Sequence, residues 1–254
     1  MVNCRICKGK LIKIVDLGKI SLVGNFLKRI KKKKKFKISL NFCIECKHVQ
    51  IEEILNRDLL FKKYLWETGV SISNIRIIED LIKKLRKYGI SKKSKILEIA
   101  SNDGSFLNLI YKKYKCLAVG IDPANNFKRL SKKKIFTITN YFNFEQSMKI
   151  KKRFKTFDYI FARNVLAHVP NPNKIFIGVK NLLNKNGKFI LEVPHLDNII
   201  RYNQYDNIFH EHIGFHSLKS IIDLSNKHNL KVFDVEKIDS QGGSIRCFLS
   251  NKKS

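Results

Sequence analysis

The stretch from Ile96 to Gly104, Ile-Leu-Glu-Ile-Ala-Ser-Asn-Asp-Gly, constrains the fold more than any other part of the chain. An apolar run leads into a loop of small residues, and the glycine stands just before a helical pattern. This order predicts a strand, a tight turn and a helix N-terminus, where backbone N–H groups can approach a ligand. A dinucleotide-binding loop would carry three glycines, with its acidic residue further along the chain. Here Glu98 precedes a glycine-poor loop, which suits a ligand with a cationic sulfonium and an amino group and no pyrophosphate.

A second strand pattern, over residues 117–122, supplies the other half of a nucleoside site. It ends in Asp122, where a carboxylate can accept hydrogen bonds from ribose hydroxyls. The alternative is that Glu98 and Asp122 only cap helices. Together the two segments resemble the S-adenosylmethionine loop of Rossmann-like methyltransferases, which makes S-adenosylmethionine the expected cofactor. The expected cofactor-binding residues are Glu98, Ala100, Asn102, Gly104, Asp122 and Asn164.

Strand and helix patterns alternate through the rest of the chain, which predicts a parallel, doubly wound sheet. The patterns cover residues 95–100, 105–114, 116–122, 136–138, 157–162, 172–183 and 188–193. Before them, apolar residues at helical spacing predict a helix over 74–88 that ends at Gly89. After a helix near 218–228, two runs at 231–238 and 244–249 predict antiparallel strands that complete a methyltransferase sheet. The fold class is therefore α/β, with a Rossmann-like methyltransferase sheet.

Two Cys-x-x-Cys pairs predict a zinc-binding module at the N-terminus. Cys4 with Cys7, and Cys43 with Cys46, can turn four thiolates toward one tetrahedral ion. Four cysteines close the coordination sphere, so the expected Zn²⁺ is structural. The alternative is a disulfide or a redox pair. Apolar runs at 11–17 and 36–42 are expected to pair as strands around a turn at 31–35, and the expected domains are 1–60 for the zinc module and 61–254 for the methyltransferase.

The composition gives a strongly basic chain, with 51 Lys and Arg against 21 Asp and Glu and a net charge of +30. Such a charge attracts polyanions, including RNA, acidic membrane surfaces and diphosphate-bearing sugars. Most lysines are spread over the polar faces of predicted helices, so we expect no nucleic-acid partner. No apolar run reaches the roughly 20 residues that a membrane span needs, so no membrane insertion is expected. Paired cysteines and a first segment without a signal-peptide core predict a cytoplasmic location.

Five of the seven histidines follow the predicted strands at 157–162 and 188–193, on the side where cofactor and substrate should meet. They are His168, His195, His210, His212 and His216. Histidine can act as a general base near neutral pH, and an adjacent carboxylate such as Glu211 can stabilise the imidazolium that forms. A metal bound by His210 and His212 is the alternative, but no fourth ligand is evident. The pattern therefore favours acid–base chemistry.

These motifs together resemble the zinc-containing sugar C-methyltransferases, which act on nucleotide-linked 4-keto-deoxysugars in antibiotic and surface-polysaccharide biosynthesis. The resemblance runs from Cys4 to about Arg246. Besides the cysteine pairs, the matching motifs are Asp16-Leu17-Gly18, Val49-Gln50, Tyr64 to Ser71, Glu98 to Gly104, Gly120 to Pro123, Asn164 to Pro170, His210-Glu211-His212 and Gly242-Gly243-Ser244.

The resemblance implies removal of the proton next to the sugar's keto group and methyl transfer to the carbon of the resulting enolate. It implies that His212 is the base, that Glu211 supports it, and that His168 is a second active-site histidine. Tyr64 or Trp66 would contact the sugar or the enolate oxygen. His210 completes the set of catalytic candidates.

The chain departs from the family pattern in three places. Ala100 replaces a glycine in the cofactor loop, and Phe209 replaces a tyrosine before His-Glu-His. The family usually continues past Gly-Gly-Ser into a further domain that helps to bind the sugar nucleotide, whereas this sequence ends at Ser254. A separate partner chain supplies that domain, or the lysine-rich surface binds the diphosphate, or the protein has little activity.

Two other functions stay open from the sequence. An RNA or protein methyltransferase would keep the cofactor and use the basic surface. A truncated, non-catalytic relative would keep the fold and bind cofactor without turnover.

Overall fold

The computed structural model describes residues 3–23, 34–127 and 134–252, and its larger sheet has seven strands. Five of them are parallel: β4 (Lys95–Ile99), β5 (Leu117–Asp122), β6 (Ile135–Thr139), β7 (Phe157–Arg163) and β8 (Leu183–Pro194). β10 (Leu230–Ile238) and β11 (Ser244–Asn251) add antiparallel strands beside β8, so the order is β10-β11-β8-β7-β4-β5-β6. This mixed sheet confirms the predicted Rossmann-like methyltransferase fold.

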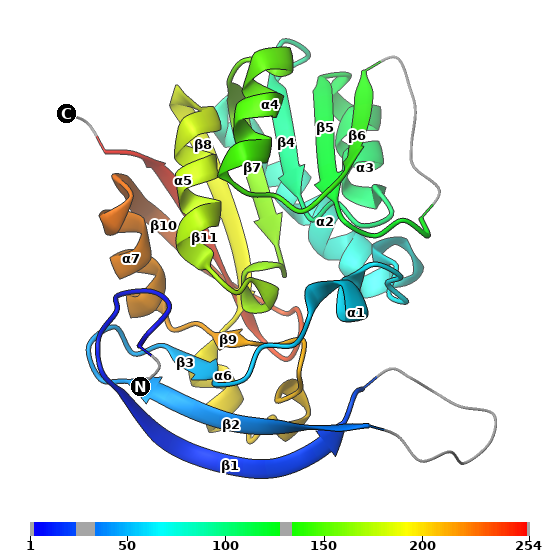
Figure 1. Cartoon of the computed structure of the whole chain (residues 1–254). Helices are drawn as coiled ribbons and strands as arrows, with labels where there is room; N and C mark the ends of the chain where they lie inside the picture. Colours follow the sequence, from blue (N-terminus) through cyan, green and yellow to red (C-terminus); the bar gives the residue numbers. More distant parts are fainter. Residues whose placement is uncertain (1–2, 24–33, 128–133, 253–254) are drawn as a thin grey trace.

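Helices cover both faces of this sheet (Figure 1). α4 (Phe144–Phe154), α5 (Pro172–Leu182) and α7 (Leu218–Lys227) bury apolar residues against one face. α2 (Ile72–Lys84) and α3 (Ser105–Tyr114) bury theirs against the other. Cys116 and Cys247 are both fully buried in these layers.

A second sheet of four strands carries the N-terminal module. β1 (Leu11–Ser21) pairs antiparallel with β2 (Lys35–Cys43), which confirms the predicted pairing. The predicted turn between them lies mostly outside the described residues. β3 (Val49–Ile51) pairs with β2, and β9 (Gly214–Phe215), which belongs to the C-terminal half of the chain, pairs with β3. The sheet therefore joins the two halves of the chain.

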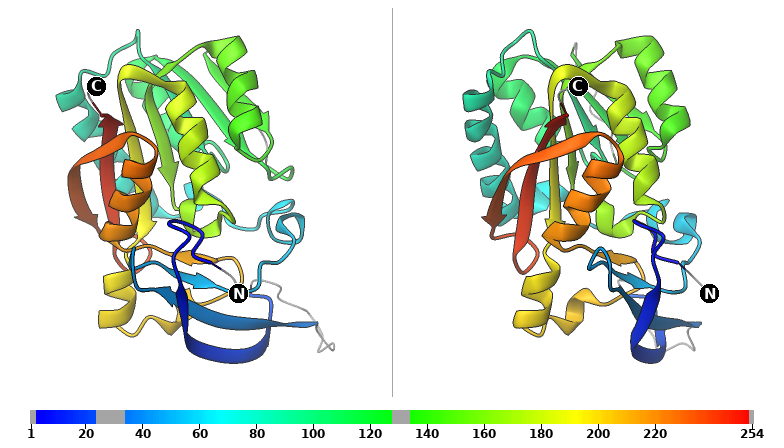
Figure 2. Two further views of the ribbon diagram at one scale, coloured as in Figure 1. Left: turned by 60° about the vertical axis from the view of Figure 1, so that its left-hand side comes forward. Right: turned by 90° about the vertical axis from the view of Figure 1, so that its left-hand side faces the viewer.

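The small sheet lies beyond the carboxyl ends of the parallel strands (Figures 1 and 2). Two short helices, α1 (Arg57–Phe61) and α6 (Leu196–Arg201), lie near the same end. β4 stands between β5 and β7. The chain adds β5 and β6 on one side of β4, and then β7 and β8 on the other side, so the order of strands reverses at β4. Open α/β sheets bind ligands at such a switch point. Among the described residues, no helix combines the length and apolar character needed to cross a bilayer.

Candidate active site

A cavity of about 940 Å³ opens at the carboxyl ends of β4, β7 and β8. Its lining residues come from eight segments of the sequence: 22–23, 59–68, 74–77, 100–102, 163–168, 192–194, 206–212 and 240–241. A smaller cavity of about 130 Å³ lies beside it, and both are lined by Tyr64, Ala100, Asn102, Asn164 and His168. The fold thus brings most of the predicted cofactor and catalytic residues to one place.

The loop after β4 has the backbone expected of a close ligand approach. Ala100 and Asn102 have φ angles of 57° and 50°, and Asn164 after β7 has 52°. All three are in the left-handed region, which costs a non-glycine residue about 1–2 kcal/mol. Gly104, with φ 80°, is the N-cap of α3. Strained residues of this kind gather at ligand sites, where the fold holds them in place.

Ala100→Gly is expected to raise the free energy of unfolding by up to about 1 kcal/mol. Glycine relieves the left-handed strain, and this gain exceeds the entropy that glycine adds to the unfolded chain. Urea denaturation of the two proteins measures the difference. The loss of a methyl group beside the cavity should also leave cofactor affinity equal or higher. A variant less stable than the wild type would show that Ala100 is not strained.

Asp122 lies at the end of β5 and lines the smaller cavity. Its two carboxylate oxygens accept hydrogen bonds from the backbone N–H groups of Asn102 (2.9 Å) and Ala124 (2.9 Å). The carboxylate thereby fixes the cofactor loop against the next strand. Apolar and aromatic residues surround it, namely Ile99, Ile121, Pro123, Phe142 and Val165. A carboxylate beside a cavity with several apolar walls fits the ribose and base of an adenosine group.

Glu98 is placed differently from the direct ligand that the sequence predicts. It is 1 % exposed and lines neither cavity; its Oε1 accepts hydrogen bonds from Nη2 (2.8 Å) and Nε (3.2 Å) of Arg163. Burial raises the pKa of Glu98 to about 7, although Arg163 opposes this shift. Its Oε2 has no hydrogen-bond partner among the described residues. Gly104 also lies outside the lining of both cavities, because its role is to begin α3.

His168 and His212 both line the larger cavity, and their ring centroids are 4.9 Å apart. Nδ1 of His212 lies 2.9 Å from the carbonyl oxygen of Asn207, and Nδ1 of His168 lies 2.9 Å from that of Glu211. Because a carbonyl can only accept, each Nδ1 carries the proton, which leaves Nε2 of His212 as an acceptor. Burial lowers the pKa of His168 to about 3, and also lowers that of His212. Both rings are therefore neutral bases at pH 7.

His210, a catalytic candidate from the sequence, does not reach the cavity. It is buried on the other side of its turn, where Nε2 lies 3.2 Å from the carbonyl oxygen of Phe36 and its ring contacts that phenyl ring edge-on. The reason is tertiary, since β2 packs against this turn and takes up the side chain. His216 likewise packs on His48, with ring centroids 4.7 Å apart.

Tyr64 and Glu211 lie close together in the lining of the larger cavity. Burial raises the pKa of Tyr64, and the negative charges of Glu211 and Asp122 raise it further. Burial also raises the pKa of Glu211. The tyrosine is therefore a neutral hydroxyl donor throughout the physiological range. Its backbone is clamped by Asn126, whose side chain bonds both the N–H and the carbonyl of Tyr64.

The cofactor loop also holds the segment that carries the single tryptophan. The Asn102 side chain accepts from the N–H of Thr68 (2.9 Å) and donates to the carbonyl of Trp66 (2.9 Å). Asp103 accepts from the N–H of Gly69 (2.8 Å). The side-chain amide of Asn102 thus makes hydrogen bonds within the protein, to the segment from Trp66 to Thr68. The sequence pattern does not reveal these bonds. Trp66 lines the larger cavity and is 48 % exposed, so its fluorescence can report ligand binding.

The four predicted zinc ligands meet in space. The sulfur atoms of Cys4, Cys7, Cys43 and Cys46 all lie within 4.8 Å of one another. Lys8 and Lys47, one after each pair, both adopt a left-handed φ, and each donates its N–H to the first cysteine's carbonyl. Two matching knuckles of four sulfurs fit a tetrahedral zinc ion.

Arg5 connects this cluster to the cavity. Its guanidinium donates to the carbonyls of Ile51 (2.6 Å) and Ile213 (2.9 Å), and its backbone N–H donates to Gln50 (2.9 Å). Ile213 directly follows His212. The zinc knuckle therefore holds the backbone behind a cavity-lining histidine.

Comparison with known proteins identifies the family. A family model described as "Methyltransferase domain" matches residues 72–235, which is well over half of the chain. The chain belongs to this methyltransferase family. A second model, "Putative zinc binding domain", matches residues 4–61. The predicted methyltransferase, its S-adenosylmethionine-binding fold and the N-terminal zinc-binding module are confirmed at this level.

Individual proteins agree with the family. The C-methyltransferase NovU of Streptomyces niveus is 30 % identical over 97 % of this chain. The present chain spans 60 % of the length of NovU. The magnesium protoporphyrin IX methyltransferase ChlM of Synechocystis PCC 6803, solved with bound SAH, has a TM-score of 0.55 at 10 % identity, over 75 % of this chain and 90 % of that one. The plantazolicin methyltransferase BpumL gives 0.55 at 12 % identity, over 70 % and 84 %. At such identities the two structures establish the fold alone.

Proposed function

We propose that this protein is an S-adenosylmethionine-dependent C-methyltransferase whose substrate is a nucleotide-linked 4-keto-deoxysugar. One arrangement carries the proposal: two neutral histidines, His168 and His212, line the same cavity as the cofactor loop. Methyl transfer to carbon needs a base that removes a proton before the methyl group arrives, whereas many acceptor heteroatoms have a lone pair ready. The similarity to a C-methyltransferase supports the same chemistry.

In this reaction His212 is the base. The hydrogen bond from its Nδ1 to the Asn207 carbonyl orients the ring and leaves Nε2 to take the proton beside the keto group. Phe209 packs on the ring at a centroid distance of 4.1 Å and limits its rotation. His168, fixed by the Glu211 carbonyl, lies beside the base and contacts the substrate in the same cavity.

The enolate oxygen that forms needs a hydrogen-bond donor, and Tyr64 supplies it. Its hydroxyl stays protonated because burial and two nearby carboxylates raise its pKa. Before the substrate binds, this single O–H donates to Glu211, and in the reaction it turns to the enolate oxygen. Glu211 supports His212, which follows it in the chain. Phe209 stands where the family has a tyrosine and brings no hydroxyl. Tyr205 is exposed and lies outside the cavity lining, so it does not supply that hydroxyl instead.

When bound, the cofactor supplies an electrophilic methyl group on sulfur. Asp122 would hold its ribose, and the strained backbone at Ala100, Asn102 and Asn164 would contact its amino-acid end and base. Glu98 would act on the cofactor site indirectly, through its hydrogen bonds with Arg163. Gly104 would contribute as the N-cap of α3. We also assign residues 1–60 to the zinc module and 61–254 to the methyltransferase domain, in a cytoplasmic enzyme.

The mouth of the cavity supports a partner or a large substrate. Leu59, Leu65 and Trp66 line the cavity, yet Leu65 is 78 % exposed. Apolar side chains left open at a site indicate a surface that something else covers. We propose that a sugar nucleotide covers part of it, and that a separate chain with the family's further domain covers the rest.

The pH dependence of methyl transfer should follow His212. The active form of the base is neutral, and burial lowers its pKa below the usual 6.5. The rate is therefore expected to fall as the ring becomes protonated, with its half-maximal value at a pH below 6.5. Initial rates under saturating cofactor measure this profile. A rate that already falls between pH 8 and 7 would mean that another group is the base.

The deciding experiment is methyl transfer from labelled S-adenosylmethionine to a panel of nucleotide-linked 4-keto-deoxysugars, with bulk RNA as a second acceptor. Label in a sugar nucleotide supports the proposal, and label in RNA replaces it with a nucleic-acid methyltransferase acting through the basic surface. Cofactor binding without label in any acceptor, even after addition of a chain carrying the further domain, favours a non-catalytic relative.

A further inference from the structure

A row of charged side chains crosses the large sheet on the face covered by α2. Glu236 of β10 is opposite Arg246 of β11, Arg246 is opposite Glu192 of β8, and Glu192 is opposite Arg163 of β7. Arg163 then bonds Glu98 of β4. Directly paired residues point to the same side of a sheet. The charges therefore alternate in sign along one continuous row, from the edge of the sheet to the strand that carries the cofactor loop.

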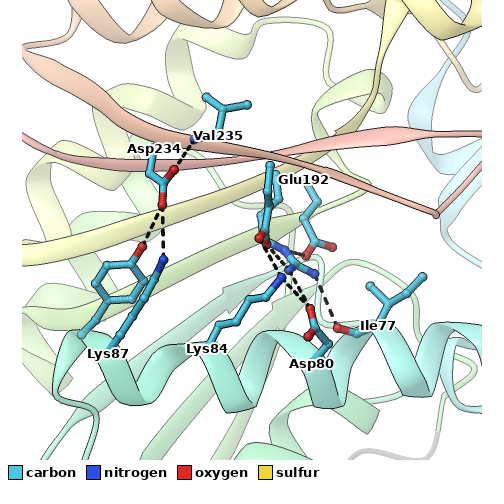
Figure 3. A network of polar contacts seen from close by, with 10 residues as sticks. Ile77, Asp80, Lys84, Lys87, Glu192, Asp234 and Val235 are labelled. Atoms are coloured by element: carbon cyan, nitrogen blue, oxygen red, sulfur yellow. Dashed lines mark hydrogen bonds and ion pairs between the residues drawn. The ribbon is translucent and has the colours of Figure 1, made fainter.

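Arg246, the second member of this row, is fully buried, and Glu192 beside it is 1 % exposed. Arg246 makes three contacts. Its Nε lies 2.5 Å from Glu192 Oε1, its Nη1 bonds Glu236, and its Nη2 lies 3.5 Å from the carbonyl of Ile77. Figure 3 shows Glu192 above α2, with Asp80 and Lys84 closing the network from that helix. Buried ion pairs contribute little net stability compared with apolar residues of equal size. Stability alone therefore gives a poor account of this row.

The row reaches the cavity at two members. Arg163 and Glu192 both line the larger cavity, at the ends of adjacent strands, and the N–H of Asn164 donates to the carbonyl of Glu192 (2.9 Å). The row holds three carboxylates against two guanidiniums, and Oε2 of Glu98 has no hydrogen-bond partner among the described residues. This end of the cavity therefore offers one positive and one negative group side by side.

We propose that Arg163 and Glu192 bind the zwitterionic amino-acid end of the cofactor, Arg163 at its carboxylate and Glu192 at its ammonium group. Arg246 is a positioning residue that holds the Glu192 carboxylate at the cavity floor. Adjacent strands are about 4.8 Å apart, a spacing that suits two opposite charges carried by one carbon atom. This inference rests on the proposed use of S-adenosylmethionine. It adds the two residues that would let the site distinguish the cofactor, which carries an amino acid, from a nucleoside that carries none.

The test compares two ligands that differ only at that end. S-adenosylhomocysteine carries the amino acid, and 5′-methylthioadenosine has the same nucleoside and thioether without it. Calorimetric titration of the full, zinc-loaded chain gives both affinities, with Trp66 fluorescence as a second readout. Glu192→Gln is expected to weaken S-adenosylhomocysteine about 10- to 100-fold, the effect of losing one hydrogen bond to a charged group. Its affinity for 5′-methylthioadenosine should stay within about twofold of wild type.

Glu236→Gln is the matched control. It makes the same chemical change on the other carboxylate that bonds Arg246, but Glu236 lies outside the cavity lining. It should leave both affinities unchanged. Glu192→Asp serves if Glu192→Gln does not fold, because it keeps the charge that buried Arg246 needs and withdraws the carboxylate from the cavity. It should also weaken only S-adenosylhomocysteine.

Three results would overturn the inference. Equal loss of both ligands would mean that Glu192 only maintains the fold, and no loss of either would remove it from the cofactor site, including the case where it binds a substrate hydroxyl instead. Wild-type protein that binds neither ligand would refute the proposed function itself and this inference with it. Either of the first two results, obtained with wild-type protein that binds both ligands, refutes the inference alone.

Discussion

Replacing His212 with alanine is expected to lower the rate of methyl transfer by about 10²- to 10⁴-fold, the usual contribution of a positioned general base. The carbon acceptor has no lone pair to attack the methyl group until its proton is removed. Cofactor affinity should change little, because the cofactor loop and Asp122 lie on other elements. Initial rates at saturating cofactor, together with S-adenosylhomocysteine titration, separate the two quantities.

His210→Ala is the control for this variant. It removes the same side chain two positions away, from a residue that bonds the carbonyl of Phe36 and lies outside the cavity. We expect it to lower stability and to leave the rate of the folded fraction within about fivefold of wild type, well short of the loss of a general base. If the two variants lost activity equally, the cavity would not be the site of proton removal. If His212→Ala stayed within tenfold of wild type, another residue would be the base.

Removal of zinc is expected to have the second large effect. A structural zinc site contributes on the order of 10 kcal/mol to the folding of a small module, and here the module is a four-stranded sheet with a cluster of four cysteine sulfurs. Cys43→Ser should therefore abolish bound zinc and unfold the segment from Cys4 to Ile51. Metal analysis and hydrogen exchange of that segment measure both results.

The same variant should also reduce methyl transfer, although no cysteine of the cluster lines the cavity. The Arg5 guanidinium bonds the carbonyl of Ile213, and β3 pairs with β9, which begins at the next residue. His212 immediately precedes Ile213. Cys247→Ser is the matched control, because it replaces another fully buried cysteine that is remote in sequence from the cluster. Its cost should be a few kcal/mol at most, without loss of zinc. A Cys43→Ser protein as stable and active as this control would exclude a structural metal.

Much of the fold can be predicted from the sequence because the relevant signals are local. The predicted helix at 105–114 coincides with α3, and the predicted strands match β4 to β8 within a few residues, apart from an earlier start of β8. α4 is missing from the prediction. Its buried residues are only Ser147, Ile150 and Phe154 among many lysines, so its periodicity is weak and the sheet has to supply the packing.

The site divides in the same way. The four cysteines, Asp122 and the left-handed Ala100 belong to short motifs whose geometry depends on a few consecutive residues, and each is where the sequence indicates. Glu98 is different, since its partner Arg163 is distant in sequence and meets it only through the pairing of β4 with β7. Arg163 and Glu192 carry no motif of their own. Only their place at the ends of buried strands could have drawn attention to them.

The sequence by itself determined the alternating architecture, the cysteine pairs of the zinc-binding module and the family of the protein, because residue type and spacing are properties of the chain alone. The tertiary structure decided which polar groups act together. His210 and His212 are chemically identical and two residues apart, yet one faces β2 and the other the cavity. In an irregular turn no repeating geometry sets the direction of a side chain, so the elements packed against each side of the turn determine it.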